Sequence, residues 1–220
     1  MKMNIEKYAN YFSFMNKKKA LIIIFAVLVI DQISKIYIKT NFFYQESVEV
    51  FSWFKILFIE NEGAAWGTKI SDFVPVSEKA AKLILTLFRL VAISAIGYWL
   101  WDSIKKQAPG VLIFSVTLIF SGAVGNIIDS LFYGLIFDQS STMHIASLFA
   151  DDPYSGLFYG KVVDMFYFPL IDTVLPDWMP FVGGNHFRFF EPVFNVADTC
   201  ISFGVFVLIL FNKTAFSQED

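Results

Sequence analysis

Hydrophobic residues occur in four long runs, which shorter and more polar stretches separate. The runs cover about residues 19–38, 80–101, 111–128 and 193–211. Each is about 20 residues long, the length that an α-helix needs to cross roughly 30 Å of hydrocarbon. Because backbone groups in lipid must find their hydrogen bonds within the segment, each run is expected to be helical. The pattern therefore predicts four membrane-spanning helices.

The first run begins like a secretory signal peptide, because three lysines at residues 17–19 precede its apolar residues. A signal peptide would continue into a cleavage site made of small residues. Here DQISK (31–35) continues the helical pattern instead. We expect the first run to be a retained signal anchor.

Basic residues beside the runs indicate the orientation of the chain, since cytoplasmic flanks carry an excess of Lys and Arg. The flanking basic residues are those at 17–19, Lys105, Lys106 and Lys213. With four spans they all fall on one side, so both termini are expected to be cytoplasmic. Residues 41–79 and 129–192 are then expected to face outward.

The segments between the runs carry strand and turn signals. Residues 48–60 mix β-branched and aromatic residues in partial alternation, which predicts two short strands or a small sheet at the membrane surface. Residues 138–160 are rich in turn residues and are expected to form a loop. Residues 170–187 are expected to be a second irregular stretch.

Composition supports a membrane protein and excludes several other classes. The 220 residues are 56% hydrophobic, which is too apolar for a soluble domain of this size. A net charge of -3 gives no reason to expect a nucleic-acid partner. One cysteine excludes an internal disulfide, and a chain with only two histidines and one cysteine argues against a protein-built zinc site. We expect no metal and no cofactor.

Polar residues interrupt the apolar pattern at five places. A charged group at membrane depth costs about 2.5–3.5 kcal/mol on insertion scales, so it usually faces a protein interior or a watery cavity. Asp31 and Lys35 are four residues apart, share a helix face and can pair. They mark either a helix end that emerges into headgroups or a polar cluster at the mouth of a site. Asn61 and Gly63 belong to a short polar segment that, taken alone, indicates a turn.

The end of the third run combines small and polar residues. Gly122 and Gly125 allow close helix packing. Asn126 and Asp129 follow them on the same predicted helix. A structural hydrogen-bonding role and a chemical role are both open for this pair.

Two more aspartates have ordinary explanations when each is taken alone. Asp164 lies in the apolar strip 161–168, where a surface aspartate in a loop is the simpler interpretation. Asn195 and Asp198 are three residues apart at the head of the fourth run, so both can point inward. Asp198 can equally be a helix cap, because a helix N-terminus favours an acidic residue.

Taken together, the aspartates suggest a site. The four that fall on the predicted outward side of the membrane are Asp31, Asp129, Asp164 and Asp198. Two carboxylates in a partly desolvated pocket repel each other, so one keeps a proton. The ionised member can then take a proton from water while the protonated member polarises an amide carbonyl. Such a pair hydrolyses amides without a metal ion.

Five motifs give the chain a resemblance to a known family. They are DQISK (31–35), NEGAAWG (61–67), GAVGNIIDS (122–130), VVDMF (162–166) and FNVADTCI (194–201). With these motifs in the family's order over most of its length, the sequence resembles the lipoprotein signal peptidases, also called signal peptidase II. The combination of FNxAD with an upstream GNxxD and VVD is more specific than any single motif.

The resemblance implies a fold and an activity. The fold is an all-α membrane fold with a small β element: four transmembrane helices, an extracytoplasmic β-cradle at about residues 45–60 and an outward insertion at about 138–160, in one domain over residues 1–220. The activity is an aspartic endopeptidase that removes the signal peptide of bacterial prolipoproteins, cleaving before the S-diacylglyceryl cysteine. Asp164 and Asp198 match the family's catalytic pair.

The resemblance also implies helpers, partners and a location. The residues implied to orient the pair or to hold the substrate are Asp31, Lys35, Asn61, Gly63, Asn126, Asp129, Asn195 and Ala197. Trp53, Phe54 and Trp66 are expected to hold the exposed backbone of the substrate. Membrane lipids and globomycin-type inhibitors are the other expected partners. We expect a monomer in the bacterial cytoplasmic (inner) membrane, with its site at the outer face.

The chain departs from the family's pattern in two ways. Ser130 stands where the family normally has an arginine after the GNxxD aspartate, and Lys161 and Arg188 are candidates to supply its charge. The stretch between Asp129 and Asp164 is also long for the family, so residues 138–160 are expected to form an external loop or lid.

Two other functions were weighed on the residues alone. A small transporter or proton-conducting protein would carry polar residues at mid-bilayer on several spans, whereas here they gather toward one boundary. A serine–lysine protease would need both side chains on one face, whereas Ser34 and Lys35 are adjacent and point to different faces of a helix.

Overall fold

Three long apolar helices form the frame of the protein. The computed structural model describes residues 12, 15–62, 76–169, 171–189 and 191–217. Within these residues, three helices are long and apolar enough to cross a membrane: Lys17–Asn41 (α2), Glu78–Lys105 (α3) and Gly110–Ile136. The last comprises α4 (Gly110–Ile128), a π-helical turn η4 (Asp129–Tyr133) and α5 (Gly134–Ile136). The first three predicted runs lie inside these helices.

The fourth run forms a shorter helix. Its first residues are strand β6 (Val193–Phe194), and the helix α6 (Val196–Leu210) follows with 15 residues. A four-residue helix, α7 (Asn212–Ala215), comes after it. The described residues thus contain three helices of spanning length and one shorter apolar helix.

Local sequence explains where these helices begin. The Asn16 side chain accepts a hydrogen bond from Lys19 N at the start of α2, and Ser77 caps α3 in the same way. At α6, Asn195 and Asp198 form a reciprocal capping box. Such caps satisfy backbone N–H groups that have no partner within the helix.

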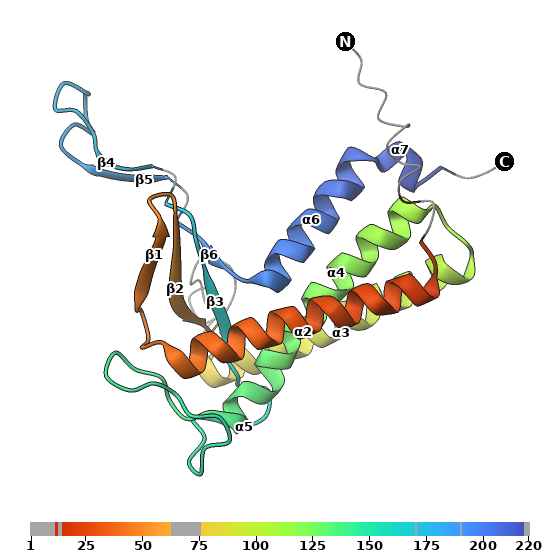
Figure 1. Ribbon diagram of the computed structural model, residues 1–220, viewed down its shortest axis with the longest axis horizontal. Helices are drawn as coiled ribbons and strands as arrows, with labels where there is room; N and C mark the ends of the chain where they lie inside the picture. The colour runs from red at the N-terminus through yellow and green to blue at the C-terminus, as the bar shows by residue number, and fades with distance from the viewer. Residues whose placement is uncertain (1–11, 13–14, 63–75, 170, 190, 218–220) are drawn as a thin grey trace.

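Helix α4 lies at the centre and contacts α2, α3 and α6 (Figure 1). Glycines permit the close approach of α6. A Cβ atom on Gly122 would lie 2.2 Å from the carbonyl oxygen of Ala197, and one on Gly204 would lie 2.7 Å from that of Ser115. The expected role of Gly122 in close packing is confirmed.

A four-stranded antiparallel sheet lies at one end of the helices (Figure 1). Its order is β1 (Ser47–Phe51), β2 (Phe54–Asn61), β3 (Val162–Tyr167) and β6. The predicted strand pair at 48–60 is confirmed. In β3, Asp164 lies opposite Ile59 of β2, and Phe166 lies opposite Phe194 of β6. The sheet therefore joins the two segments that carry Asp164 and Asp198.

Two expectations about loops are wrong. Asp164 lies on a paired strand rather than in a surface loop, because β2 and β6 flank its strand from distant parts of the sequence. Residues 170–187 are not irregular throughout: β4 (Ile171–Val174) pairs with β5 (His186–Phe189) in a hairpin. The turn signals that suggested an irregular stretch lie between these two strands.

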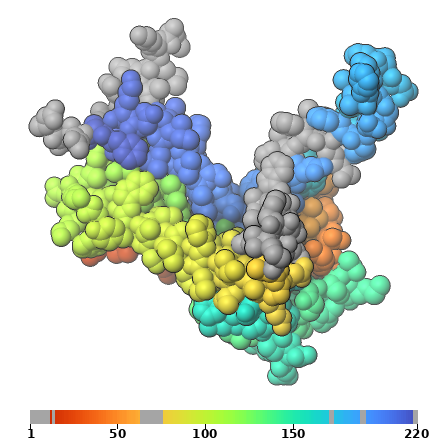
Figure 2. Space-filling model, turned by 180° about the vertical axis from the view of Figure 1, so that it is seen from behind, coloured from red at the N-terminus to blue at the C-terminus, as the bar shows by residue number. Residues whose placement is uncertain are grey.

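The hairpin β4–β5 projects away from the helices, and the surface between it and α6 is a deep notch (Figure 2). Residues 138–160 form turns without a named helix or strand, as expected. Backbone bonds hold this segment to the preceding helix: Tyr154 N donates to Phe137 O at 2.9 Å, and Ser155 N donates to Gly134 O at 2.9 Å.

Candidate active site

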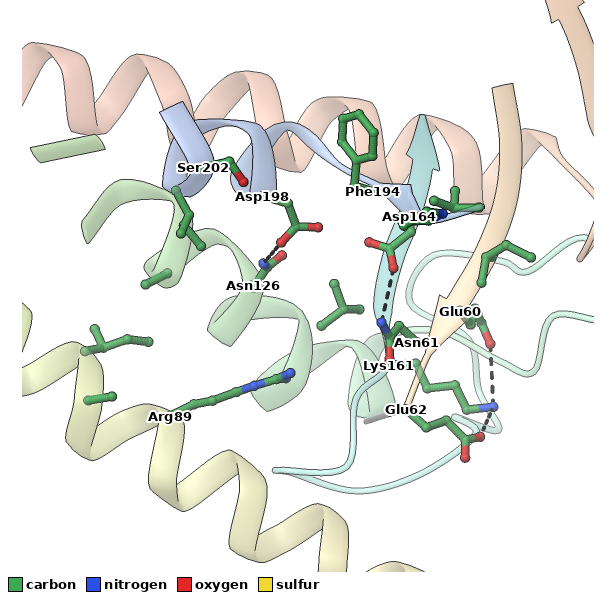
Figure 3. A pocket seen from close by; sticks show the side chains of 18 of the residues that line it. Glu60, Asn61, Glu62, Arg89, Asn126, Lys161, Asp164, Phe194, Asp198 and Ser202 are labelled. Carbon is green, nitrogen blue, oxygen red and sulfur yellow. Dashed lines mark hydrogen bonds and ion pairs between the residues drawn. The ribbon is translucent and has the colours of Figure 1, made fainter. Parts of the chain in front are cut away.

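A cavity of about 1060 Å³ lies where the sheet meets the helices. Side chains from α3, α4, α6, β2, β3 and β6 line it. Asp164 and Asp198 both point into this cavity from opposite sides (Figure 3). The two aspartates that the motifs singled out, 34 positions apart in the chain, therefore share one space.

Asp164 is held on β3 in an almost fully enclosed position, with 4% of its surface exposed. Asn195 Nδ2 donates to its Oδ1 at 2.7 Å, and Asn61 Nδ2 donates to its Oδ2 at 3.4 Å. Burial, and next the negative charge of Asp198, raise the pKa of Asp164 to about 7. A carboxyl group in this environment can keep its proton near neutral pH.

Asp198 lies in the first turn of α6 and is more open to the cavity. Its Oδ2 accepts from Asn195 N at 3.3 Å, which is one half of the capping box. Its Oδ1 accepts from Asn126 Nδ2 at 2.7 Å. Asp198 is thus a helix cap and a cavity residue at once, so the two interpretations of this residue were not exclusive.

Two asparagine amides connect the carboxylates. Asn195 Nδ2, which donates to Asp164, also lies 3.1 Å from Asn126 Oδ1, and Asn126 donates in turn to Asp198. Each amide donates to one carboxylate, while Asn126 Oδ1 accepts from Asn195 and Asn195 Oδ1 accepts from Asp198 N. The hydrogen bonds of these two asparagines fix the orientation of both carboxyl groups in the absence of a bound molecule.

A buried ionic triad lies behind the asparagines. Lys35 Nζ contacts Asp31 Oδ2 and Asp129 Oδ2 at 2.9 Å each, and all three side chains are 0% exposed. Lys35 also donates to Asn126 Oδ1 at 2.9 Å. The expected Asp31–Lys35 pair is confirmed, and the alternative of a helix end emerging into headgroups is wrong for these two residues.

The triad holds the backbone directly before each cavity aspartate. Asp31 Oδ1 accepts from Ala197 N at 2.9 Å, and Asp129 Oδ2 accepts from Val163 N at 3.3 Å. Close packing keeps this arrangement in place, since a Cβ on Gly125 would lie 2.7 Å from Asp31 Oδ2. The triad therefore places β3 and α6 relative to each other.

Seven of the eight predicted helper residues come together around the two aspartates. They are Asp31, Lys35, Asn61, Asn126, Asp129, Asn195 and Ala197. Gly63, the eighth, and Trp66 lie outside the described residues. Trp53 and Phe54 lie at the β1–β2 turn, where Phe54 stacks on Phe168 at 4.8 Å and Phe168 stacks on Phe194 at 5.6 Å. Phe194 lines the cavity, so an aromatic surface leads from that turn to the site.

Sequence reasoning missed Arg89. Its side chain reaches from α3 toward the cavity and donates to Ser130 Oγ at 3.3 Å (Figure 3). Lys161 was a candidate to supply the charge of the arginine that Ser130 replaces. It instead pairs with Glu62 at 2.9 Å and Glu60 at 3.6 Å. The signal for Arg89 was present, because it is a charged residue inside an apolar run, the same signal that identified Asp31.

Lys39 is a buried cation that the sequence analysis did not identify, and it connects the long insertion to the sheet. Lys39 pairs with Glu60 on β2 and donates to Ser140 Oγ at 2.9 Å. Ser140 Oγ donates to Glu60 Oε1 at 3.0 Å. The insertion is thereby anchored one residue from Asn61, the partner of Asp164.

Comparisons with known proteins agree with these motifs. The family described as Signal peptidase (SPase) II matches residues 23–213. A lipoprotein signal peptidase of Porphyromonas gingivalis is 45% identical over 190 residues, which are 86% of this chain and 80% of that protein. One from Amoebophilus asiaticus is 34% identical over 195 residues, 87% of this chain and 76% of that protein.

A solved structure of a bacterial membrane enzyme has a similar fold. It superposes with a TM-score of 0.54 at 23% identity, covering 93% of this chain and 94% of its own. At this identity the likeness concerns the fold alone. The family model matches most of the chain, and two relatives are 45% and 34% identical over 86% and 87% of it, so this chain belongs to the signal peptidase II family.

Proposed function

We propose that this protein is an aspartic endopeptidase that removes the signal peptide of bacterial prolipoproteins, with Asp164 and Asp198 as its catalytic pair. Cleavage takes place before the S-diacylglyceryl cysteine. The observation that carries the proposal is the shared cavity, into which two carboxylates project from β3 and α6 while an asparagine chain orients both. Family membership supplies the reaction class.

The two carboxyl groups share one proton in the reactive state. The ionised member takes a proton from a water molecule, whose oxygen bonds to the scissile carbonyl carbon. The protonated member gives its proton to the carbonyl oxygen, which yields a gem-diol. The C–N bond then breaks as the amide nitrogen receives the proton taken from water, and a gem-diol proton returns to the other carboxyl group. Water is consumed, and the pair ends in its starting state.

The supporting residues have separate roles in this scheme. Asn126 and Asn195 orient the carboxyl groups, and Asn61 holds the second oxygen of Asp164. The buried triad supplies the fixed backbone at Val163 and Ala197. A site prepared in this way does not have to reorganise during the reaction.

The membrane arrangement follows from the same proposal. Helix α6 is the fourth span, both termini are cytoplasmic, and the sheet is the outward β-cradle at the surface of the bacterial inner membrane. The prolipoprotein enters laterally, with its acyl chains in the outer leaflet. Its extended segment lies along the aromatic surface of Trp53, Phe54, Phe168 and Phe194, which ends at the cavity.

The test is cleavage of a lipidated prolipoprotein by the purified full-length protein, followed by release of the signal peptide. Asp164→Asn and Asp198→Asn should each lower the rate by at least about 100-fold, the contribution expected of an acid–base group. Asp151→Asn, which changes an exposed aspartate in the insertion, is the matched control and should cleave normally. A folded Asp164→Asn or Asp198→Asn protein with the wild-type rate would disprove the catalytic pair.

Competitive inhibition of cleavage tests whether the substrate binds in the proposed site. A globomycin-type cyclic peptide should stop cleavage by the wild-type protein in competition with the substrate. The transporter alternative is not favoured, because the matched relatives are peptidases and the charged residues gather at one end of the helices.

A further inference from the structure

Arg89 occupies an unusual position for an arginine. The chain has only two arginines, and Arg89 is the one inside an apolar helix of spanning length. Helix α3 buries little of its surface against the protein, so a permanent charge there is costly unless it has a task. Its side chain reaches from α3 toward the cavity that Asp164 and Asp198 also line (Figure 3).

The charge of Arg89 acts unequally on the carboxylates of the site. Arg89 donates to Ser130 Oγ at 3.3 Å, Ser130 Oγ donates to Asn126 O at 3.1 Å, and Asn126 donates to Asp198 Oδ1 at 2.7 Å. Coulomb energy grows as distance and dielectric constant fall, so a guanidinium at the wall of a poorly solvated cavity acts on the carboxylates that line it. The hydrogen bond to Ser130 Oγ at 3.3 Å keeps the guanidinium on the α4 side of the cavity, where Asn126 holds Asp198.

The local surroundings of the two aspartates also favour the negative charge on Asp198 rather than on Asp164. Asp198 sits at the N-terminus of α6, where the helix dipole favours a negative charge, and a backbone N–H donates to it. Asp164 sits on a strand, is 4% exposed and accepts from two side-chain amides. Paired carboxyl groups in unlike environments take unlike roles.

The other charged groups near the pair are Lys35, Lys82 and Lys161 and the carboxylates of Glu60, Glu62 and Glu191. Lys35 lies between two carboxylates, so the triad as a whole carries one negative charge. Lys161 lines the cavity but is paired with Glu60 and Glu62. Arg89 and Lys161 are the described cations that line the cavity, and Arg89 is the one joined through Ser130 to Asn126, the partner of Asp198.

We propose that Arg89 is a positioning residue that keeps the negative charge of the pair on Asp198. Asp198 is then the base that takes the proton from the attacking water, and Asp164 is the acid that gives its proton to the carbonyl oxygen. The inference rests on the proposed function and assigns the roles within it. The raised pKa of Asp164, about 7, agrees with its place as the protonated partner.

The first test is the pH dependence of kcat/KM in charge-changing variants. Arg89→Gln removes the positive charge, so ionising the pair requires a higher pH, and the acidic limb should move up by about one pH unit. Arg89→Lys keeps the charge and should keep the limb in place. Lys79→Gln, which removes an exposed charge from the same helix, is the matched control. An Arg89→Gln profile with an unmoved acidic limb would overturn the inference, even if the rate were lower throughout.

Placing an arginine at position 130 instead of position 89 distinguishes the effect of the positive charge from the effect of the packing of the Arg89 side chain. Ser130 Oγ touches the guanidinium, so an arginine side chain from position 130 can reach the same wall. The double variant Arg89→Gln/Ser130→Arg should return the acidic limb toward the wild-type pH. A folded double variant with the limb of Arg89→Gln alone would count against a role for the charge.

The second test compares the two asparagine variants. An asparagine mimics a neutral carboxyl group and still donates a hydrogen bond, so it substitutes better for the acid than for the base. Residual cleavage should therefore be at least about tenfold higher in Asp164→Asn than in Asp198→Asn, within the range of a general-acid contribution. Equal or reversed residual rates would overturn the assignment and leave the catalytic pair standing, whereas full activity in either variant would remove the pair itself.

Discussion

Replacing Lys35 tests whether the buried triad holds the site together. Lys35→Met replaces the lysine with an unbranched side chain one atom shorter and leaves Asp31 and Asp129, both 0% exposed, without their shared cation. Removing one partner of a buried ion pair costs about 3–5 kcal/mol, because the remaining charge stays buried. For a protein of this size, that loss corresponds to a fall in Tm of about 6–20 °C.

The measurement is thermal unfolding in detergent micelles, with prolipoprotein cleavage assayed below the transition. Cleavage should fall as well, because the contacts to Ala197 N and Val163 N depend on the triad. Lys106→Met is the control: it breaks the exposed pair with Asp102 and should leave Tm nearly unchanged.

A further variant distinguishes lost charge balance from lost packing. In Lys35→Met/Asp31→Asn/Asp129→Asn no uncompensated charge remains, so part of the stability should return. An unchanged Tm in Lys35→Met would refute the reasoning outright. A triple variant no more stable than Lys35→Met would show that packing, rather than charge balance, sets the loss.

Three other predictions follow from contacts at the site. Gly122→Ala should lower Tm and the cleavage rate, because the added Cβ would lie 2.2 Å from the carbonyl oxygen of Ala197. Gly156→Ala is the control and should be neutral, since nothing lies within 4 Å of its added Cβ, and equal effects of the two variants would contradict this reasoning. Asn195→Ala should destabilise α6 by about 0.5–2 kcal/mol and lower kcat, and an unchanged kcat would contradict its orienting role. In the wild type, kcat/KM should decline on the alkaline side from near pH 7, as Asp164 loses its proton; a plateau to pH 9 would contradict it.

Sequence predicted the parts of this protein that depend on local patterns. The first three apolar runs gave helices, since length and hydropathy alone decide that outcome. The pairing of Asp31 with Lys35 followed from their spacing on one helix. The Asn195–Asp198 capping box likewise needs only three residues of separation. In each case the interacting groups are close in the chain.

The missed features depend on contacts between distant segments. Asp164 is buried because β2 and β6 pair with its strand, and no pattern within residues 161–168 reports those partners. The contact between Asp129 and Val163 N joins positions 34 residues apart. Arg89 has no charged residue three or four positions away in the chain, so the pattern of residues 80–101 alone does not connect it to the site, although the cost of burial applies equally to a guanidinium.

The triad explains how a membrane enzyme keeps two carboxylates in register when they come from separate elements. A strand and a helix N-terminus could shift relative to each other, and a misplacement of about 1 Å can cost on the order of 100-fold in rate. Asp31 and Asp129 accept from the backbone N–H groups of Ala197 and Val163, the residues directly before the two aspartates proposed as catalytic, and Lys35 contacts both carboxylates and Asn126. The relative position of the two proposed catalytic groups is therefore set by buried charges on α2 and η4.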